Sequence, residues 1–304
     1  MNKLLFLFSL ITSIIFVIPY SVKAEGDFMV TPAKMELELK PGTKTSFDIS
    51  ITNRTGRTAT FLLGAEDITS EENGDVKLLG MFAGSFPLKD YIKASFREIE
   101  INDGEKSVVS ITVDLPVWIK DPGLYGAVTI TLLNPASVGG NARIQTQIGV
   151  PILVSTGLQA KVAGRIDLFD TLSGRKIIFS GPVDLKISYS NEGDLHLRPG
   201  GIIEITNLFG MKSEPAIVGP WFVLPGSTRS ILTTLGTPYS FGRYTLGLTI
   251  NNGVDNKLEN AKLVVWVLPW RILLAIFAGL VVLYVLLRMF GLFEIKFKNT
   301  WLKK

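Results

Sequence analysis

The sequence predicts an all-β protein: two tandem Ig-like β-sandwich domains followed by a single transmembrane helix. Three observations support this fold class. Several segments alternate apolar and polar residues with the period of two that half-buried strands show. Clusters rich in Gly, Asn, Asp and Pro separate these segments and supply the residues that tight turns require. One long apolar segment lies close to the end of the chain.

Residues 1–24 have the features of a secretory signal peptide. Lys3 precedes an apolar stretch from Leu4 to Ile18. The sequence SVKA at 21–24 places small residues at the −3 and −1 positions of a cleavage site before Glu25. An uncleaved anchor is the alternative. In either case the middle of the chain is predicted to work outside the cytoplasm.

Residues 25–157 are predicted to form the first sandwich and residues 158–268 the second. The clearest strands are MELELK (35–40), SFDISIT (46–52), SVVSITVDL (107–115), VDLKISYS (183–190) and YTLGLTI (244–250). Both halves contain a long alternating strand that ends in an asparagine, Asn53 in the first and Asn191 in the second. Similar strands and Gly-containing turns then follow in the same order, which indicates a weak internal repeat.

The first half contains an apparent insertion, Leu78 to Phe96, that is rich in aromatic residues and glycine. It either closes the sandwich as an edge hairpin or forms an exposed loop that contacts a ligand. Trp118 could stack on a sugar, with packing in the core or an interface as the alternative. The candidate ligand contacts are the aromatic residues Phe82, Phe86, Tyr91, Trp118 and Tyr125.

Residues 269–290 are predicted to be the transmembrane helix. Sixteen uncharged, largely apolar residues separate Arg271 from Arg288, and both arginines can extend their charged groups to the interface. The tail, 291–304, carries four lysines. This asymmetry predicts a single-pass protein of the cell membrane with its β-domains outside and its C-terminus in the cytoplasm.

The net charge of +4 does not indicate a nucleic-acid-binding protein. Eight of the 31 basic residues lie in the two terminal regions, and Glu294 is the only acid there. The exported part therefore carries 23 positive and 26 negative side chains. The chain has no cysteine, which excludes disulfides and thiolate chemistry. The exported domains must rely on their apolar cores for stability.

No catalytic or cofactor-binding motif is found, and the protein is predicted not to be an enzyme. His196 is the only histidine, and no nucleophile motif accompanies it. The acids of the segment AEDITSEENGD (65–75) could bind calcium, but their spacing fits no EF-hand loop and a turn is the simpler interpretation. We therefore expect neither a metal nor a cofactor.

The segment from Met29 to Val76 resembles the N-terminal domain of the WxL-interacting proteins of Gram-positive bacteria. So do VSITVDLPVWIKDPGLYGAV (109–128) and the terminal anchor with its basic tail. The resemblance implies a signal peptide, a peptidoglycan-binding Ig-like domain, a second Ig-like domain that binds a partner, and one membrane helix. The sequence of residues 158–268 shows no such resemblance.

Two functions remain open at this point. The first is a non-catalytic, membrane-anchored surface protein that binds cell-wall polymer such as peptidoglycan, a surface protein partner, or both. The alternative is a chaperone-like accessory membrane protein that engages exported partners by β-strand addition.

Overall fold

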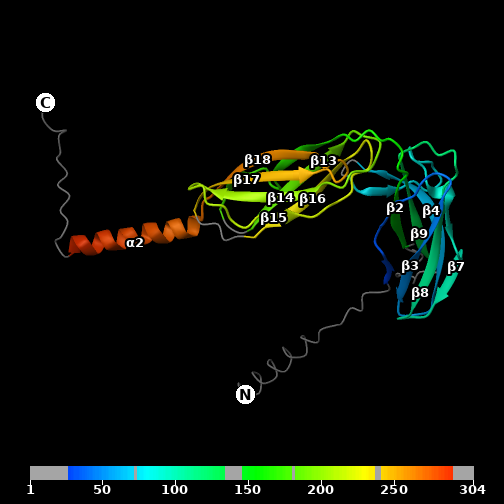
Figure 1. Cartoon of the computed structure of the whole chain (residues 1–304). Helices are drawn as coiled ribbons and strands as arrows, with labels where there is room; N and C mark the ends of the chain where they lie inside the picture. The colour runs from blue at the N-terminus through cyan, green and yellow to red at the C-terminus, as the bar shows by residue number, and fades with distance from the viewer. Residues whose placement is uncertain (1–26, 72–73, 134–145, 180–181, 237–240, 290–304) are drawn as a thin grey trace, which may run out of the picture. The chain divides into compact units, whose positions relative to one another are not determined.

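The computed structural model describes residues 27–71, 74–133, 146–179, 182–236 and 241–289, apart from the side chain of Ile272. The predicted signal peptide and basic tail lie outside these residues. The chain forms two compact units (Figure 1). Unit 1 comprises Met1–Ile68, Leu78–Ile119 and Leu124–Val154, and unit 2 comprises Thr69–Lys77, Lys120–Gly123 and Ser155–Lys304.

Unit 1 is a sandwich of two sheets. One sheet has the strand order β1 (Asp27–Thr31), β3 (Lys44–Arg54), β8 (Lys106–Asp114) and β6 (Ile92–Ala94). The other has the order β2 (Met35–Glu38), β10 (Gln147–Ser155), β9 (Gly123–Leu133), β4 (Ala59–Ser70) and β5 (Val76–Leu78), and β7 (Glu98–Ile101) also pairs with β4. The all-β prediction is confirmed for this part of the chain.

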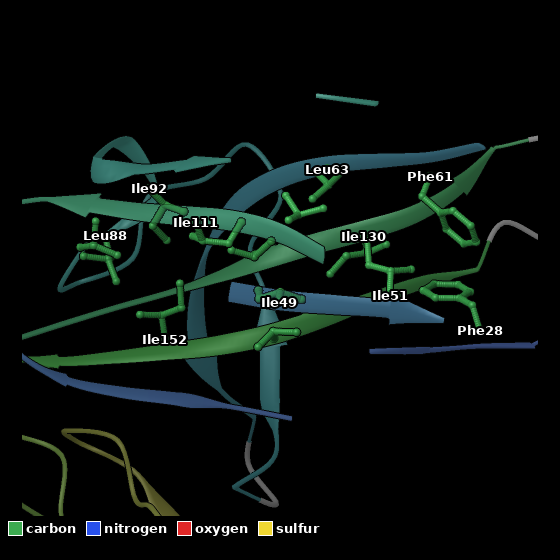
Figure 2. Packing of buried hydrophobic residues seen from close by; sticks show 14 of the residues in the cluster. Phe28, Ile49, Ile51, Phe61, Leu63, Leu88, Ile92, Ile111, Ile130 and Ile152 are labelled. Carbon is green, nitrogen blue, oxygen red and sulfur yellow. The ribbon is translucent and has the colours of Figure 1, made fainter. Parts of the chain in front are cut away.

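The core of unit 1 lies between its two sheets, as Figure 2 shows. Ile49 and Ile111 from the first sheet and Phe61, Ile130 and Ile152 from the second are all fully buried. Ile49 and Ile111 alternate with more exposed residues in β3 and β8, whereas β9 is buried at every residue but its last. The period-two pattern therefore reflects one face of each sheet turned toward a shared apolar core.

The insertion from Leu78 to Phe96 is not a hairpin. It begins at the last residue of β5, which belongs to one sheet. It then contains the short 3-10 helix η1 (Lys89–Tyr91) and strand β6, which pairs with β8 in the other sheet. Leu88 and Ile92 are buried in the core. Its second half thus closes the sandwich, as one alternative predicted, whereas its first half is exposed.

Unit 2 is also built from two sheets around one core. The smaller has the order β11 (Gly164–Thr171), β13 (Val183–Asn191) and β16 (Thr228–Leu235). The larger has the order β12 (Ile177–Ile178), β18 (Leu258–Val267), β17 (Gly242–Asn251), β14 (Gly200–Asn207) and β15 (Ala216–Val218). Residues from both sheets, such as Ile187 and Leu248, share the buried cluster.

The two asparagines of the sequence repeat make the same contacts in their own units. The Asn53 Nδ2 group donates to the carbonyls of Arg57 and Ile101, each at 2.8 Å, and its Oδ1 accepts from the Thr55 amide at 2.9 Å. Both asparagines are fully buried. Each ties the end of a core strand to the turn that follows and to a distant strand or loop.

Asn191 repeats this pattern in unit 2. Its Nδ2 donates to the carbonyls of Leu195 (2.9 Å) and Val223 (3.0 Å), and its Oδ1 accepts from the Gly193 amide (2.9 Å). The backbone agrees as well: Gly104 donates to the carbonyl of Asn53, and Gly226 donates to that of Asn191, both at 2.9 Å. The internal repeat seen in the sequence is therefore also present in the structure.

The helix α2 runs from Trp270 to Met289. Large apolar side chains are exposed along it, including every residue from Leu280 to Leu286. Among the helices formed by the described residues, none meets the length and apolarity expected of a membrane span. The predicted transmembrane helix is therefore not supported by this criterion, and membrane localisation stays a prediction.

Candidate polypeptide-binding surface

The structure separates the five predicted contact residues into exposed and packed groups. Phe82 and Trp118 are exposed, with 78% and 69% of their surfaces accessible. Tyr125 is buried, and the ring of Phe86 packs edge-to-face against it with 5.9 Å between ring centroids. Tyr91 is half-buried against the core of unit 1. Only the first two are displayed for contact with another molecule.

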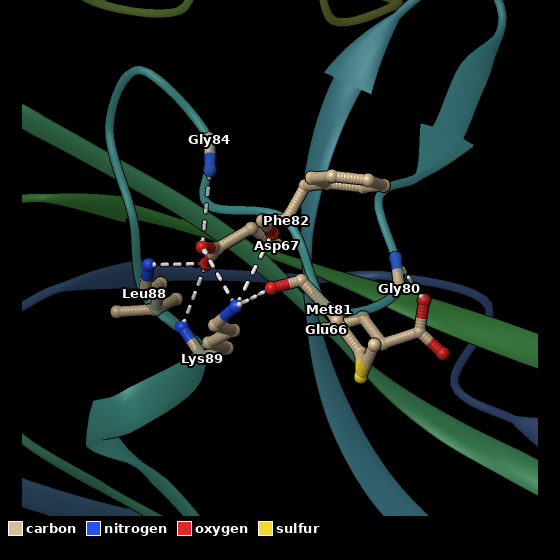
Figure 3. A network of polar contacts seen from close by, with 8 residues as sticks. All are labelled: Glu66, Asp67, Gly80, Met81, Phe82, Gly84, Leu88 and Lys89. Carbon is tan, nitrogen blue, oxygen red and sulfur yellow. Dashed lines mark hydrogen bonds and ion pairs between the residues drawn. The ribbon is translucent and has the colours of Figure 1, made fainter.

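Phe82 lies in a loop that a buried carboxylate holds in place. Asp67 is fully buried near the end of β4. Its Oδ1 accepts hydrogen bonds from the backbone amides of Leu88 and Lys89, both at 2.9 Å, and its Oδ2 accepts from that of Gly84 at 3.1 Å (Figure 3). Bonds to a charged acceptor are among the stronger hydrogen bonds in proteins.

The other side of the loop is fixed by the neighbouring residue, Glu66. Its Oε2 accepts from the Gly80 amide and its Oε1 from Gln147 Nε2, both at 2.8 Å. Because successive side chains of a strand point to opposite faces, Glu66 and Asp67 hold the loop on both faces of β4. The loop therefore passes around the edge of this strand.

The tip of this loop is apolar and exposed. Met81 and Phe82 have 96% and 78% of their surfaces accessible. The Lys89 ammonium group donates to both of their carbonyls, at 3.1 and 3.2 Å, and lies 4.0 Å from Asp67 Oδ2 (Figure 3). We call Met81 and Phe82 the clamped tip. Its backbone is ordered before any partner binds, which lowers the entropic cost of contact.

A second surface is the outer edge of β16 in unit 2, from Ser230 to Thr234; Gly74 lies against Thr228 and Arg229 at the start of the strand. β16 pairs with β13 through all eight of its residues, without a bulge. The Asn191 amide donates to the carbonyl of Ser227 in the same register. Because hydrogen-bonded pairs alternate in an antiparallel ladder, the odd-numbered residues of β16 bond to β13. The amides and carbonyls of Ser230, Leu232 and Thr234 therefore face outward.

The other long edge strand of unit 2 is protected. β11 has a register irregularity between Ile166 and Leu168. The Glu259 carboxylate accepts the Ile166 amide at 2.8 Å, and Arg165, Asp167 and Asp170 place charges along the strand. Bulges and charges of this kind prevent edge strands from pairing with other chains.

Gly74 packs against Thr228 and Arg229 at the start of β16. From Ser230 onward, β16 lacks these protections in the part of the chain that the structure describes. Its only charged residue is Arg229, at the start of the strand. The guanidinium lies 4.3 Å from the centroid of the Phe222 ring and donates to the carbonyl of Phe222 at 3.2 Å. Burial lowers the pKa of Arg229, and the negative charge of Asp75 opposes this shift. The rest of the strand is uncharged and regular.

The remaining edge strands β1, β2, β5, β6, β7, β12 and β15 have two to five residues each. β16 is therefore the longest edge among the described strands that is neither bulged nor charged along its length. This segment was not identified as an edge strand from the sequence. The available signal was the run of uncharged residues from Ser230 to Leu235.

The other sites considered from the sequence show no chemistry of their own. His196 is buried. Glu66 and Asp67, candidates for a calcium site, instead hold the loop of the clamped tip. Within the described ranges, no three His, Cys, Asp or Glu side chains come together as a metal-binding group. Glu72 and Asn73, part of the predicted turn, lie outside those ranges.

No family model matches the chain, and no curated protein matches it. Among solved structures it is similar to the class 5 fimbriae chaperone CfaA, with 12% identity over 79% of this chain and 99% of that chain and a TM-score of 0.39. It is also similar to the Pseudomonas aeruginosa CupB2 chaperone, with 10% identity, coverage of 77% and 98%, and a TM-score of 0.35.

A third similar structure is the CsuC–CsuE chaperone–tip adhesion subunit pre-assembly complex from Acinetobacter baumannii. It has 13% identity over 67% of this chain and 89% of that chain, with a TM-score of 0.36. At these identities and TM-scores the likeness carries no argument about function. None of these three is a WxL-interacting protein, and that resemblance stays a prediction.

Proposed function

We propose that the protein is a non-catalytic, chaperone-like accessory protein that binds an extended segment of an exported polypeptide by β-strand addition at β16. The observation that supports this most directly is the regular, uncharged edge of β16. An added strand would take up the outward amides and carbonyls of Ser230, Leu232 and Thr234. Main-chain hydrogen bonds of this kind provide affinity with little dependence on the sequence of the partner.

The clamped tip supplies a second contact in this proposal. Ordered apolar side chains that project from a fixed backbone are typical of the residues that dominate protein interfaces. The tip therefore favours a protein partner over a polymer of hydrophilic sugars. Binding to peptidoglycan, the first function predicted from the sequence, would use exposed aromatic rings such as that of Trp118.

The proposal is tested by retention of exported polypeptides on the immobilised full chain, with insoluble peptidoglycan assayed in parallel. The key variant is Leu232→Pro, because the amide that proline removes faces away from β13. We expect this variant to keep the melting temperature of the wild type within a few degrees and to lose most polypeptide retention. The control Ile231→Pro removes an amide that bonds to β13, and we expect a clearly lower melting temperature.

Two further variants separate the two surfaces. The double substitution Met81→Ser and Phe82→Ser should weaken retention without affecting the β16 edge, because neither side chain is buried. Deletion of residues 82–89 is less informative, because it removes the buried Leu88 and the structural Lys89. Wild-type binding to peptidoglycan alone, or full retention by Leu232→Pro, would contradict strand addition.

A further inference from the structure

We infer that β16 pairs with the β16 of a second copy of this chain when no partner strand is bound, so that the free protein is a two-fold symmetric dimer. The pairing itself follows from the register of β16 and does not depend on the proposed function. Only its consequence, that dimerisation and partner binding exclude each other, rests on that function.

The outward-facing positions of β16 are symmetric about Leu232. An antiparallel pair aligns outward residues of one strand with outward residues of the other. With a two-fold axis between the two Leu232 residues, Ser230 of each copy lies opposite Thr234 of the other. Every outward amide and carbonyl of these residues then finds a partner. Such a self-matching surface is what an isologous interface requires.

The side chains fit this alignment as well. Leu232 is 63% exposed, and in the pair it would contact its own counterpart across the axis. Ser230 and Thr234 lie on the same face and are uncharged. The pairing runs from Ser230 to Thr234, and Arg229, which Gly74 contacts, lies outside it. Like charges directly opposite each other destabilise strand pairs. The alignment places none in this position.

A second copy also has an energetic advantage over a disordered foreign strand. β16 is already held in an extended conformation by β13 and by the core contacts of Ile231 and Leu235. Two such strands lose little backbone freedom when they pair, whereas a flexible segment must be ordered at a cost of roughly 1–2 kcal/mol per residue. The dimer would join two three-stranded sheets into one of six strands.

The absence of cysteine from the natural chain allows a direct test. Opposed residues of a hydrogen-bonded pair have Cα atoms about 5.5 Å apart, within the range that a disulfide spans. Under a mild oxidant, the full chain with Leu232→Cys should form a disulfide-linked dimer. The control Ile217→Cys, an 81% exposed position on the edge strand β15, should remain mostly monomeric.

Charges introduced at the axis provide a second readout, by sedimentation of the full chain in detergent. Leu232→Lys and Leu232→Glu should each be monomeric, because each places two like charges on the axis, and an equimolar mixture should form dimers. A wild-type chain that sediments as a monomer at its highest soluble concentration overturns the inference, as does equal cross-linking of both cysteine variants. A monomer that still retains exported polypeptides would leave the proposed function intact, whereas a dimer that retains none would contradict that function alone.

Discussion

At the scale of single residues, buried polar groups decide which parts of the surface are ordered. Asp67 accepts three backbone amides from the loop that carries the clamped tip. Lys89 contributes one of these amides and also bonds to the tip through its ammonium group. Two charged side chains thus replace the regular ladder that would fix this segment in a strand. An exposed apolar tip can be ordered only because its flanks are held in this way.

Tyr189 gives a prediction for the pH dependence of stability. It is buried in the core of unit 2 against Trp221, with 6.4 Å between ring centroids. Burial, with smaller contributions from the negative charges of Glu259 and Asp255, raises the pKa of Tyr189 to about 12. In the unfolded chain this hydroxyl ionises at about pH 10. The contribution of the raised pKa of Tyr189 to the free energy of unfolding is therefore fully present below about pH 10 and is lost as the pH rises toward about 12.

We therefore expect the free energy of unfolding to fall more steeply between these values in the wild type than in Tyr189→Phe. Over this pH interval, the free energy of unfolding of the wild type should fall by about 2 kcal/mol more than that of the variant. Denaturant titrations at a series of pH values measure it. Parallel curves for the two proteins would show that Tyr189 ionises normally in the folded state.

At the scale of elements, each unit has a buried asparagine that joins the end of a core strand to the turn that follows it. Asn53 and Asn191 both use one buried amide to fix three backbone groups. The two edge strands of one sheet in unit 2 nevertheless differ in whether they can pair with another chain. β11 is bulged and charged, which blocks pairing, whereas β16 is regular and open to another strand.

The shared asparagine predicts matched losses of stability. Asn191→Ala leaves the buried carbonyl of Val223, the part-buried carbonyl of Leu195 and the Gly193 amide without this partner, and we expect a loss of about 2–4 kcal/mol in the free energy of unfolding. Asn53→Ala should behave similarly. Asn207→Ala is the control, because its two bonds lie in an exposed turn and its loss should be below about 1 kcal/mol. Chemical denaturation that ranks all three alike would refute this role.

At the scale of the whole molecule, each of the two sandwiches buries large apolar side chains, whereas α2 exposes its own. Each sandwich encloses its own core. The described side chains from Leu280 to Leu286 cover every face of α2 and remain exposed. A helix that is apolar all round requires an apolar environment, such as a protein core or a lipid bilayer.

We expect this helix to hold the protein on a membrane. After cell lysis, the full chain should sediment with the membrane fraction. A chain truncated after Leu268 should remain in the supernatant, because both sandwich cores are complete without α2. Recovery of the full chain in the supernatant would refute membrane association.

The sequence by itself determined the strands, many of their turns and the repeat of Asn53 and Asn191. These features depend on neighbours a few residues apart, whose alternation and turn chemistry can be read along the chain. Of the residues predicted to contact a ligand, Phe82 is exposed, whereas Phe86 and Tyr125 pack against each other. Local composition does not distinguish an aromatic residue on the surface from one that supports a fold.

Only the tertiary structure decided that β16 is an open edge and that Asp67 orders the clamped tip. Strand order depends on pairing between distant segments, and the residues of β16 pair with residues of β13 that lie 38 to 52 positions earlier in the chain. Asp67 likewise binds amides 17 to 22 residues further on. The sequence lists the donors and acceptors, but which of them remain unpaired at an edge depends on how the strands assemble.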